Sequence, residues 1–287
     1  MPGLRIAVTL MALANPAGFF SKVASDVEPE VSAVFGHVRV NPEDQQTAIR
    51  EGRAAQQAAR MVLALPDVQF DIVDASSSSE RWGSLSASGK PTYVWQFRKS
   101  ADGRSTPPPA YLLRHEIGHD LFVRYLVPST RADQYGGDAP DWLDEMAAVA
   151  FEGEELRLVR RRAAVRYAQE KTLIPLQRFL TMTHPEMAAK SISVSPDGTM
   201  RAFEAVSDET PKFYAMASAF YDFLVKRTGN PAIVAELAVA VRRGQPIERW
   251  LLTRIGHDKE SDGIQALSAD FLAWIATDQW YGGGSSQ

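Results

Sequence analysis

The stretch that most limits how this chain can fold is YLLRHEIGHDLF, residues 111–122, in which two of the chain's five histidines lie four residues apart. Residues spaced three or four apart along a helix share one face. Here that face carries Leu112, His115, His119, Phe122 and Leu126. The pattern therefore predicts an amphipathic helix that presents two imidazole rings to the interior, where each ring needs a metal ion or a hydrogen-bonding neighbour.

Histidines at positions i and i+4 of a helix can both reach one tetrahedral zinc ion. Glu116, directly after His115, would then lie beside the metal, close to a bound water. Zinc lowers the pKa of such a water to about 7, and a carboxylate can take its proton as it attacks a carbonyl. The pattern thus predicts one zinc ion held by His115 and His119, with Glu116 as general base. The alternative is a metal-free helix in which each histidine is hydrogen-bonded to a neighbour.

A catalytic zinc ion needs a third protein ligand, and the fourth position is left for water. The next histidine along the chain is His184, so a carboxylate from the segment PDWLDEMAAVAFE, residues 140–152, is the natural donor. Taken alone, the residues leave four candidates open: Asp141, Asp144, Glu145 and Glu152. The chain has no cysteine, which excludes thiolate ligands, disulfides and a cysteine nucleophile.

HEIGH at 115–119, followed downstream by WLDE at 142–145, resembles the gluzincin metallopeptidases, the thermolysin-like and aminopeptidase-like group. In that group the second motif often reads W-L-x-E-G-x-A, and its glutamate is the third zinc ligand. The resemblance implies a zincin-like α+β fold, a zinc-dependent peptidase and Glu145 as that ligand. Met146 stands where the family usually has glycine, a departure that concerns local packing and leaves the ligand in place.

A second resemblance lies in FYAMASAFYDFLVKRTG, residues 213–229, which is similar to a later helix of the bacterial MA-like members of this group. Such families use a downstream tyrosine or histidine to hydrogen-bond the oxyanion of the tetrahedral intermediate. Tyr214 and Tyr221 lie seven residues apart and hence on one face, so either is a candidate; Tyr214 comes first and His184 is the alternative donor. The resemblance also implies that a strand before the histidine helix is the edge that binds an extended peptide, and residues 91–99 occupy that place.

Other charged residues near the motifs have simpler expected roles. Carboxylates close to the ligands in sequence can orient the histidines through their second ring nitrogen, and the candidates are Asp120, Asp141 and Asp144. His37 and His257 are expected to be structural or exposed. The basic run 160–162 follows several glutamates and is expected to be a solvated helix face, because a net charge of −4 gives no overall attraction for nucleic acid.

The chain divides into an α/β part at 29–128, which ends in the histidine helix, and a mostly helical part at 129–280, which carries the third ligand, followed by a flexible tail at 281–287. Strands are expected at 31–40, 68–75 and 91–99. Helices are expected at 42–65, 106–126 with Thr106 as N-cap, 141–167 and 210–229, then in two segments that end at Gly244 and Gly256, and at 264–280. Residues 191–206 are expected to form a hairpin or an extended loop.

Residues 1–28 read as a signal peptide and leader, because Arg5 precedes a short apolar run and Ala12 and Ala14 form an A-x-A pattern. This predicts a periplasmic or secreted protein; a first element of a cytoplasmic protein is the alternative. No other segment approaches the roughly 18 apolar residues of a membrane span. The expected partner is a peptide or protein substrate, and the oligomeric state stays open. The alternative function is a catalytically inactive gluzincin-fold binding or assembly module, against which the intact Glu116 argues.

Overall fold

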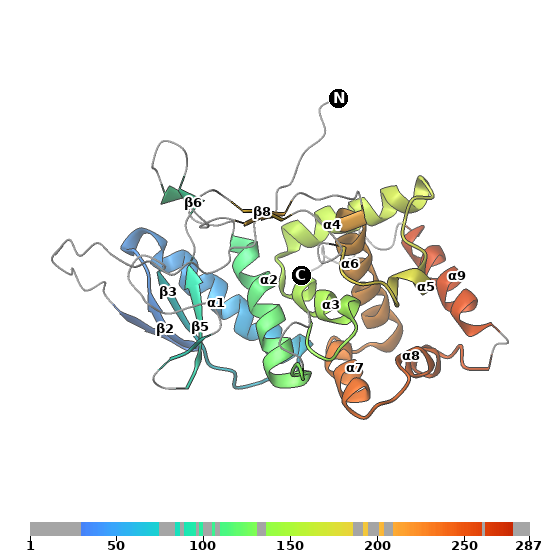
Figure 1. Cartoon of the computed structure of the whole chain (residues 1–287), viewed down its shortest axis with the longest axis horizontal. Coiled ribbons are helices and arrows are strands. Elements are labelled where there is room, and N and C mark those ends of the chain that lie inside the picture. Colours follow the sequence, from blue (N-terminus) through green and yellow to red (C-terminus); the bar gives the residue numbers. More distant parts are fainter. Residues whose placement is uncertain are drawn as a thin grey trace, which may run out of the picture.

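The computed structural model describes residues 30–74, 84–86, 89–95, 98–99, 105–106, 110–130, 136–185, 192–194, 201–203, 209–259 and 262–277. Within them the fold is α+β, as predicted, with a small mixed sheet at one end and a group of helices at the other (Figure 1). The predicted N-terminal leader and C-terminal tail lie outside the described residues.

Five strands form the sheet in the order β1-β2-β3-β5-β4, with β2, β3 and β5 parallel and the two outer strands antiparallel to their neighbours. Their bounds are Val31–Ala33 (β1), Gly36–Arg39 (β2), Asp71–Asp74 (β3), Ser84–Leu85 (β4) and Pro91–Trp95 (β5). The single strand predicted at 31–40 is wrong, because the chain turns between β1 and β2 and forms a hairpin. Gly36, with φ at +151°, permits this turn, since a Cβ there would lie 2.0 Å from the carbonyl oxygen of Phe70.

The expectation that residues 91–99 form the edge strand is also wrong. β5 ends at Trp95 and lies between β3 and β4. Residues 98–99 belong to a separate strand, β6 (Arg98–Lys99), which pairs with β7 (Ser105–Thr106). Strand order depends on pairings between segments distant in sequence, which alternation within one segment does not reveal.

Helix α1 (Pro42–Val62) joins β2 to β3 and confirms the helix predicted at 42–65. Proline at its start and acidic residues in its first turn suit a helix N-terminus. Its buried face is mostly alanine and glycine, so the side chains that precede and line the sheet can pack close to the helix backbone. A Cβ on Gly52 would lie 2.1 Å from the ring of Phe35. That ring stacks on Phe70, which in turn contacts Tyr93, and the three aromatics form the core between α1 and the sheet.

Helix α2 (Ala110–Leu121) carries the two histidines and continues into a π-helical turn, η1 (Phe122–Leu126). Thr106 was expected to cap this helix but belongs to β7, and the described helix begins at Ala110. α2 packs against α1 and against the next helix along the chain, α3, which places the histidines at the junction of the α/β and helical parts (Figure 1).

The single helix predicted at 141–167 is wrong, because it is two helices, α3 (Asp141–Phe151) and α4 (Glu154–Gln169). Glu152 and Gly153 between them have extended backbones, with ψ of 156° and 159°. Almost all of α3 is buried, since α2 covers one side of it and α6 another. The break redirects the chain after α3, and it fixes where the side chain of Glu152 can go.

The remaining predicted helices are confirmed as α6, α7, α8 and α9, and a short helix α5 was not expected. Their bounds are Leu176–Phe179 (α5), Glu209–Thr228 (α6), Ile233–Arg242 (α7), Ile247–Ile255 (α8) and Gly263–Ile275 (α9). The segment left open between hairpin and loop contains an antiparallel pair, β8 (Ile192–Val194) and β9 (Arg201–Phe203).

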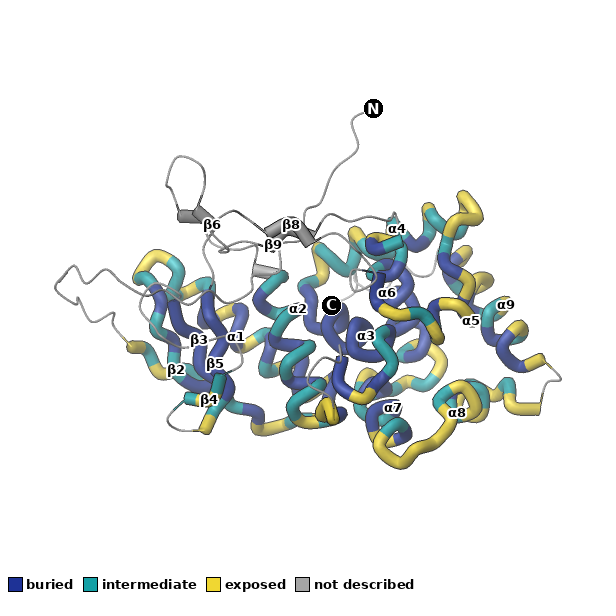
Figure 2. Tube along the Cα trace, viewed as in Figure 1, coloured by how far each residue is buried: buried dark blue, intermediate teal, exposed yellow. Residues whose placement is uncertain are grey.

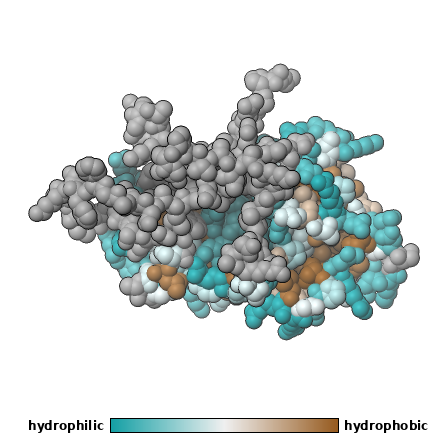
Figure 3. Space-filling model, viewed as in Figure 1, coloured by the Kyte–Doolittle hydropathy of each residue, from teal (hydrophilic) through white to brown (hydrophobic). Residues whose placement is uncertain are grey.

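Strands β3 and β5 and helix α3 are almost entirely buried, whereas α1 and α2 alternate buried with more exposed residues, as the mixed colours of α2 in Figure 2 show. In the view of Figure 3 the described surface is largely hydrophilic, with hydrophobic residues gathered mainly over the helical part. Among the described helices, none combines the length and apolar character that crossing a membrane would need.

Candidate metal centre

The structure brings three of the predicted site residues together. His115 and His119 from α2 and Glu145 from α3 place their ligand atoms within 4.8 Å of one another, and this group could hold a metal ion. Nε2 of His115 lies 3.1 Å from Nε2 of His119 and 3.7 Å from Oε1 of Glu145. Nε2 of His119 lies 3.6 Å from Oε2 of the same carboxylate. Of the four carboxylates that the sequence left open as third ligand, Glu145 is the one in this group.

Gly118, between the two histidines, explains how α3 can come this close to α2. A Cβ at Gly118 would lie 2.9 Å from the Cα of Ala148 and 3.2 Å from the ring of Phe151. Glycine therefore lets the two helix backbones approach until Glu145 faces the histidines. Met146, which stands where the gluzincin motif usually has glycine, is fully buried on α3.

The other ring nitrogen of each histidine is held by a carboxylate. Nδ1 of His119 lies 2.8 Å from Oδ2 of Asp144, and Nδ1 of His115 lies 2.8 Å from Oε1 of Glu152. An ionised carboxylate can only accept, so both Nδ1 atoms donate, and the rings are oriented with Nε2 toward Glu145. Asp144 was predicted in this role, whereas Glu152 was expected only as a candidate ligand.

The two other carboxylates predicted to orient the histidines, Asp120 and Asp141, accept hydrogen bonds from other groups. Asp120 accepts hydrogen bonds from the hydroxyl of Tyr93 at 2.8 Å and from Arg124 at 2.9 Å, and so ties the sheet to the end of α2; its expected contact with a histidine is corrected. Asp141 accepts from the backbone N–H of His184 at 2.7 Å. It acts on the site by fixing the segment that carries His184.

Glu145 is buried, and the groups that face its carboxylate are the rings of His115, His119 and His184, at 3.4 to 3.7 Å. Its side chain is fully buried, and among the described residues neither carboxylate oxygen has a hydrogen-bond partner. A buried carboxylate needs a positive charge or hydrogen bonds close by, and a metal cation among Glu145 and the two histidines would supply a closer contact than the histidine nitrogens do. The residues present could therefore hold a metal ion.

The charges around the site keep Glu145 ionised and His119 protonated when no metal competes. Burial alone would raise the pKa of Glu145, but His115, His184 and His119 together lower it to about 2. Burial alone would lower the pKa of His119, but Asp144, with Glu145 and Glu116, raises it to about 10. The site thus favours positive charge at the position between the three ligand atoms.

Glu116 and Tyr214, two of the predicted catalytic residues, lie beside this group. Glu116 is partly buried on α2, and its charge is one of those that raise the pKa of His119. The ring of Tyr214, on α6, packs edge-on to the ring of His115 with centroids 5.9 Å apart, and to the ring of His184 at 5.7 Å.

His184 reaches the group from the segment after α5. It is buried to 1% exposure, and its Nε2 lies 3.4 Å from Oε2 of Glu145. Its ring also packs against Phe213, with centroids 5.0 Å apart. His184 therefore points at Glu145, and its ring lies against the aromatic rings of Phe213 and Tyr214.

Tyr221 is not brought to the histidines. Its hydroxyl donates to the carbonyl oxygen of Pro231 at 3.0 Å, after the end of α6, and Arg157 lies over its ring. Burial raises the pKa of this hydroxyl to about 12. The expectation that Tyr221 could serve the site is corrected, because its one donor hydrogen is already used.

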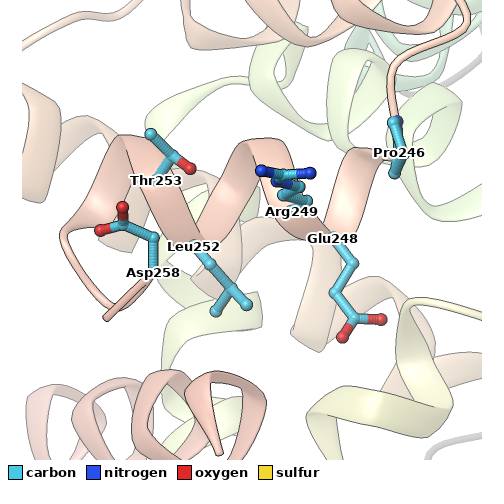
Figure 4. Close-up of a pocket in the computed structure, with 6 residues that line it drawn as sticks. All are labelled: Pro246, Glu248, Arg249, Leu252, Thr253 and Asp258. Atoms are coloured by element: carbon cyan, nitrogen blue, oxygen red, sulfur yellow. The ribbon is translucent and has the colours of Figure 1, made fainter. Parts of the chain in front are cut away.

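A hollow of about 390 Å³ elsewhere does not serve this group. It lies along α8 and its flanking turns (Figure 4). In Figure 1, α3 and α7 lie between α8 and the histidine helix α2. The residues that line the hollow are Pro246, Glu248, Arg249, Leu252, Thr253 and Asp258. They are mostly exposed and include charges of both signs, so the hollow is a shallow surface feature.

No protein-family model, curated protein or solved structure matches the chain.

Proposed function

We propose that this protein is a zinc-dependent hydrolase with a zincin-like fold, and that it cleaves peptide bonds. The observation that carries the proposal is the placement of Glu145, a buried carboxylate without a hydrogen-bond partner among the described residues, opposite the Nε2 atoms of His115 and His119. The likeness of HEIGH and WLDE to the gluzincin motifs supports a peptide as substrate. A periplasmic or secreted location belongs to the proposal and rests on the sequence of residues 1–28 alone.

Zinc is the proposed metal because of the ligand set and its spacing. Two imidazoles and one carboxylate are a common set in catalytic zinc sites, where three protein ligands leave one position open. Ligand atoms about 2.0–2.1 Å from a tetrahedral zinc ion are about 3.3 Å apart. Here the two Nε2 atoms are 3.1 Å apart, and those of His115 and His119 lie 3.7 and 3.6 Å from different oxygens of Glu145. Taken with one ligand atom from each residue, the group lies within 4.8 Å, so the side chains must move closer together to bind the ion.

The proposed roles of the other residues follow from their positions. When bound, zinc would polarise a carbonyl group and make a water molecule acidic enough to lose a proton near neutral pH. Glu116 would accept the proton of the attacking water and return it to the leaving amine. The hydroxyl of Tyr214 would donate a hydrogen bond to the oxyanion. His184 is assigned to Glu145 and not to the oxyanion, because it is buried and points at that carboxylate.

Substitution of Glu116 tests the proposed reaction. Glu116→Gln keeps the size of the side chain and removes the base, so the variant should bind zinc like the wild type and lose cleavage of a proteome-derived peptide library by about 10² to 10⁴-fold. Glu155→Gln, on the first turn of α4, is the matched control and should cleave normally. Equal cleavage by Glu116→Gln and wild type would remove Glu116 from the mechanism, and no cleavage by the zinc-loaded wild type would contradict the peptidase.

A further inference from the structure

Arg160 was expected on a solvated helix face, yet its side chain is 15% exposed and directed into the molecule. It is the first residue of the basic run 160–162 on α4. Its neighbour Arg161 pairs with Asp222 of α6 and with Glu154, on a different side of the helix. Both arginines are therefore largely buried, unlike the solvated face expected from the sequence, and Arg160 is the one that contacts the residues around the histidines.

The guanidinium of Arg160 binds the carboxylate that orients His115. Its Nε lies 2.5 Å from Oε2 of Glu152, and its terminal nitrogen contacts Oε1. The same Oε1 accepts from Nδ1 of His115 at 2.8 Å. Arg160, Glu152 and His115 thus form a buried chain that ends at a proposed metal ligand, and the two-point contact fixes the plane of the carboxylate.

The face of the same guanidinium covers Tyr214. The Cζ atom of Arg160 lies 4.5 Å from the centre of the Tyr214 ring, a cation–π contact. That ring packs against His115 with centroids 5.9 Å apart. Arg160 therefore touches both the carboxylate behind His115 and the tyrosine proposed to serve the oxyanion.

Glu152 has an arginine partner in addition to its histidine, whereas Asp144 has its histidine alone among the described residues. The side chain of Glu152 is 1% exposed, and its partners in the described part of the chain are Arg160, which supplies a full positive charge, and His115. For Asp144, the described residues provide His119 alone. Without Arg160, Glu152 would be a buried carboxylate with no counter-charge, an arrangement that side chains avoid by turning toward water or losing the charge.

We propose that Arg160 is a positioning residue of the metal centre, which holds Glu152 on His115 and Tyr214 beside it. The proposal rests on the metal site of the proposed function and does not depend on which bond is cleaved. Because Arg160 acts through Glu152, its contribution to metal binding should vanish once Glu152 can no longer accept the same contacts.

A double-mutant cycle on zinc affinity tests this. Zinc dissociation constants are measured by competition with a chromogenic chelator for wild type, Arg160→Gln, Glu152→Gln and the double variant. Each single substitution should weaken zinc binding about 10 to 100-fold. The double variant should bind zinc like Glu152→Gln alone. Unchanged affinity in Arg160→Gln, or losses that multiply fully in the double variant, would overturn the proposal.

Two further variants keep the result decisive. Arg161→Gln removes a similarly buried ion pair from the same helix and should leave zinc affinity at the wild-type value. Should Arg160→Gln fail to fold, Arg160→Lys is used, because it keeps the charge and loses the planar fork and the stacking. A loss of zinc affinity in Arg160→Lys that disappears in the Glu152→Gln background supports the proposal, and wild-type affinity contradicts it.

The readout separates this inference from the proposed function. If the wild type binds zinc and cleaves no peptide, the peptidase proposal falls and the cycle still decides the role of Arg160. If the wild type cleaves peptide and the cycle is additive, the positioning role alone falls. If the wild type binds no zinc, both fall.

Discussion

Oε1 of Glu152 lies 2.8 Å from Nδ1 of His115, although Glu152 follows the end of α3 and the residue after it begins the turn into α4. The corresponding contact to His119 comes from Asp144, which lies within α3 beside Glu145, the proposed third ligand. The two histidines are thus oriented by carboxylates from two differently built segments, and each contact can be removed separately.

The first prediction concerns Asp144. Asp144→Asn keeps the shape of the side chain but weakens the hydrogen bond from His119 and the electrostatic support of the site. Zinc affinity should fall about 10 to 100-fold, measured by chelator competition. The matched control is Asp138→Asn, because Asp138 is exposed and accepts from Thr130 away from the histidines. Wild-type affinity in Asp144→Asn would show that this carboxylate does not support the site.

The second prediction concerns the third ligand. Glu145→Ala removes the carboxylate that faces both Nε2 atoms, so zinc affinity should fall by about one to two orders of magnitude or more. Equilibrium dialysis against buffered zinc measures the loss, with Glu155→Ala as a control on an exposed position of α4. Unaltered affinity would move the third ligand to another carboxylate.

The third prediction concerns the contact between α2 and α3. In Gly118→Ala the new Cβ meets the backbone of Ala148 at 2.9 Å and must push the helices apart. The free energy of unfolding should fall by about 1–3 kcal/mol, measured by urea denaturation of the zinc-free protein, and zinc affinity should fall as well. Helix propensity works in the opposite direction, because alanine is favoured over glycine within a helix. A gain in stability would therefore show that the two backbones are not in close contact.

The fourth prediction concerns pH. The raised pKa of His119, about 10, means that its protonated form stabilises the metal-free fold fully below about 6.5 and that this contribution is lost as pH rises through about 10. The lowered pKa of Glu145, about 2, gives a contribution that is present above about 4.5 and lost as pH falls through about 2. Both groups therefore contribute fully to the stability of the metal-free fold between about pH 4.5 and about pH 6.5.

Zinc must displace the proton on His119, so its effect has the opposite pH dependence. The rise in Tm caused by saturating zinc should grow from about pH 6 to about pH 8, with protons released on binding. Thermal unfolding with zinc and with a chelator at each pH measures this rise. A zinc effect that is constant or shrinks with increasing pH would contradict the assignment of His119.

The fifth prediction compares two tyrosines on α6. Tyr214→Phe should lower kcat about 10 to 10³-fold with little change in KM, because the hydroxyl is proposed to act on the oxyanion. Tyr221→Phe should cleave at the wild-type rate and lose about 1 kcal/mol of unfolding free energy, since its hydroxyl donates to Pro231. The reverse pattern of rates would exchange their assigned roles.

The parts of the site that repeat a short local pattern could be predicted from the sequence. The spacing of His115 and His119 fixes their common face on a helix, and the WLDE motif identifies Glu145, which the structure places opposite them. The same local reasoning predicted Asp144 as an orienting carboxylate, because it neighbours Glu145 in the sequence, and the structure places it on Nδ1 of His119.

The parts that depend on distant contacts could not be predicted. The pattern of residues 141–167 is helical throughout, and Gly153 gave the only local signal of the break that turns Glu152 toward His115. From the sequence, Arg160 belongs to a basic run that is typical of a solvated helix face. Its inward position depends on Glu152, whose own position the sequence does not reveal. Tyr221 was grouped with Tyr214 by helix periodicity, whereas its hydroxyl is used by Pro231, outside the helix.

The zinc content of the protein, purified in metal-free buffers and then titrated with zinc, tests the central claim most directly. We predict about one tightly bound zinc ion per wild-type chain and a marked loss in Glu145→Ala. Less than about half an equivalent in the wild type, with none recovered on titration, would contradict the metal centre and the function built on it.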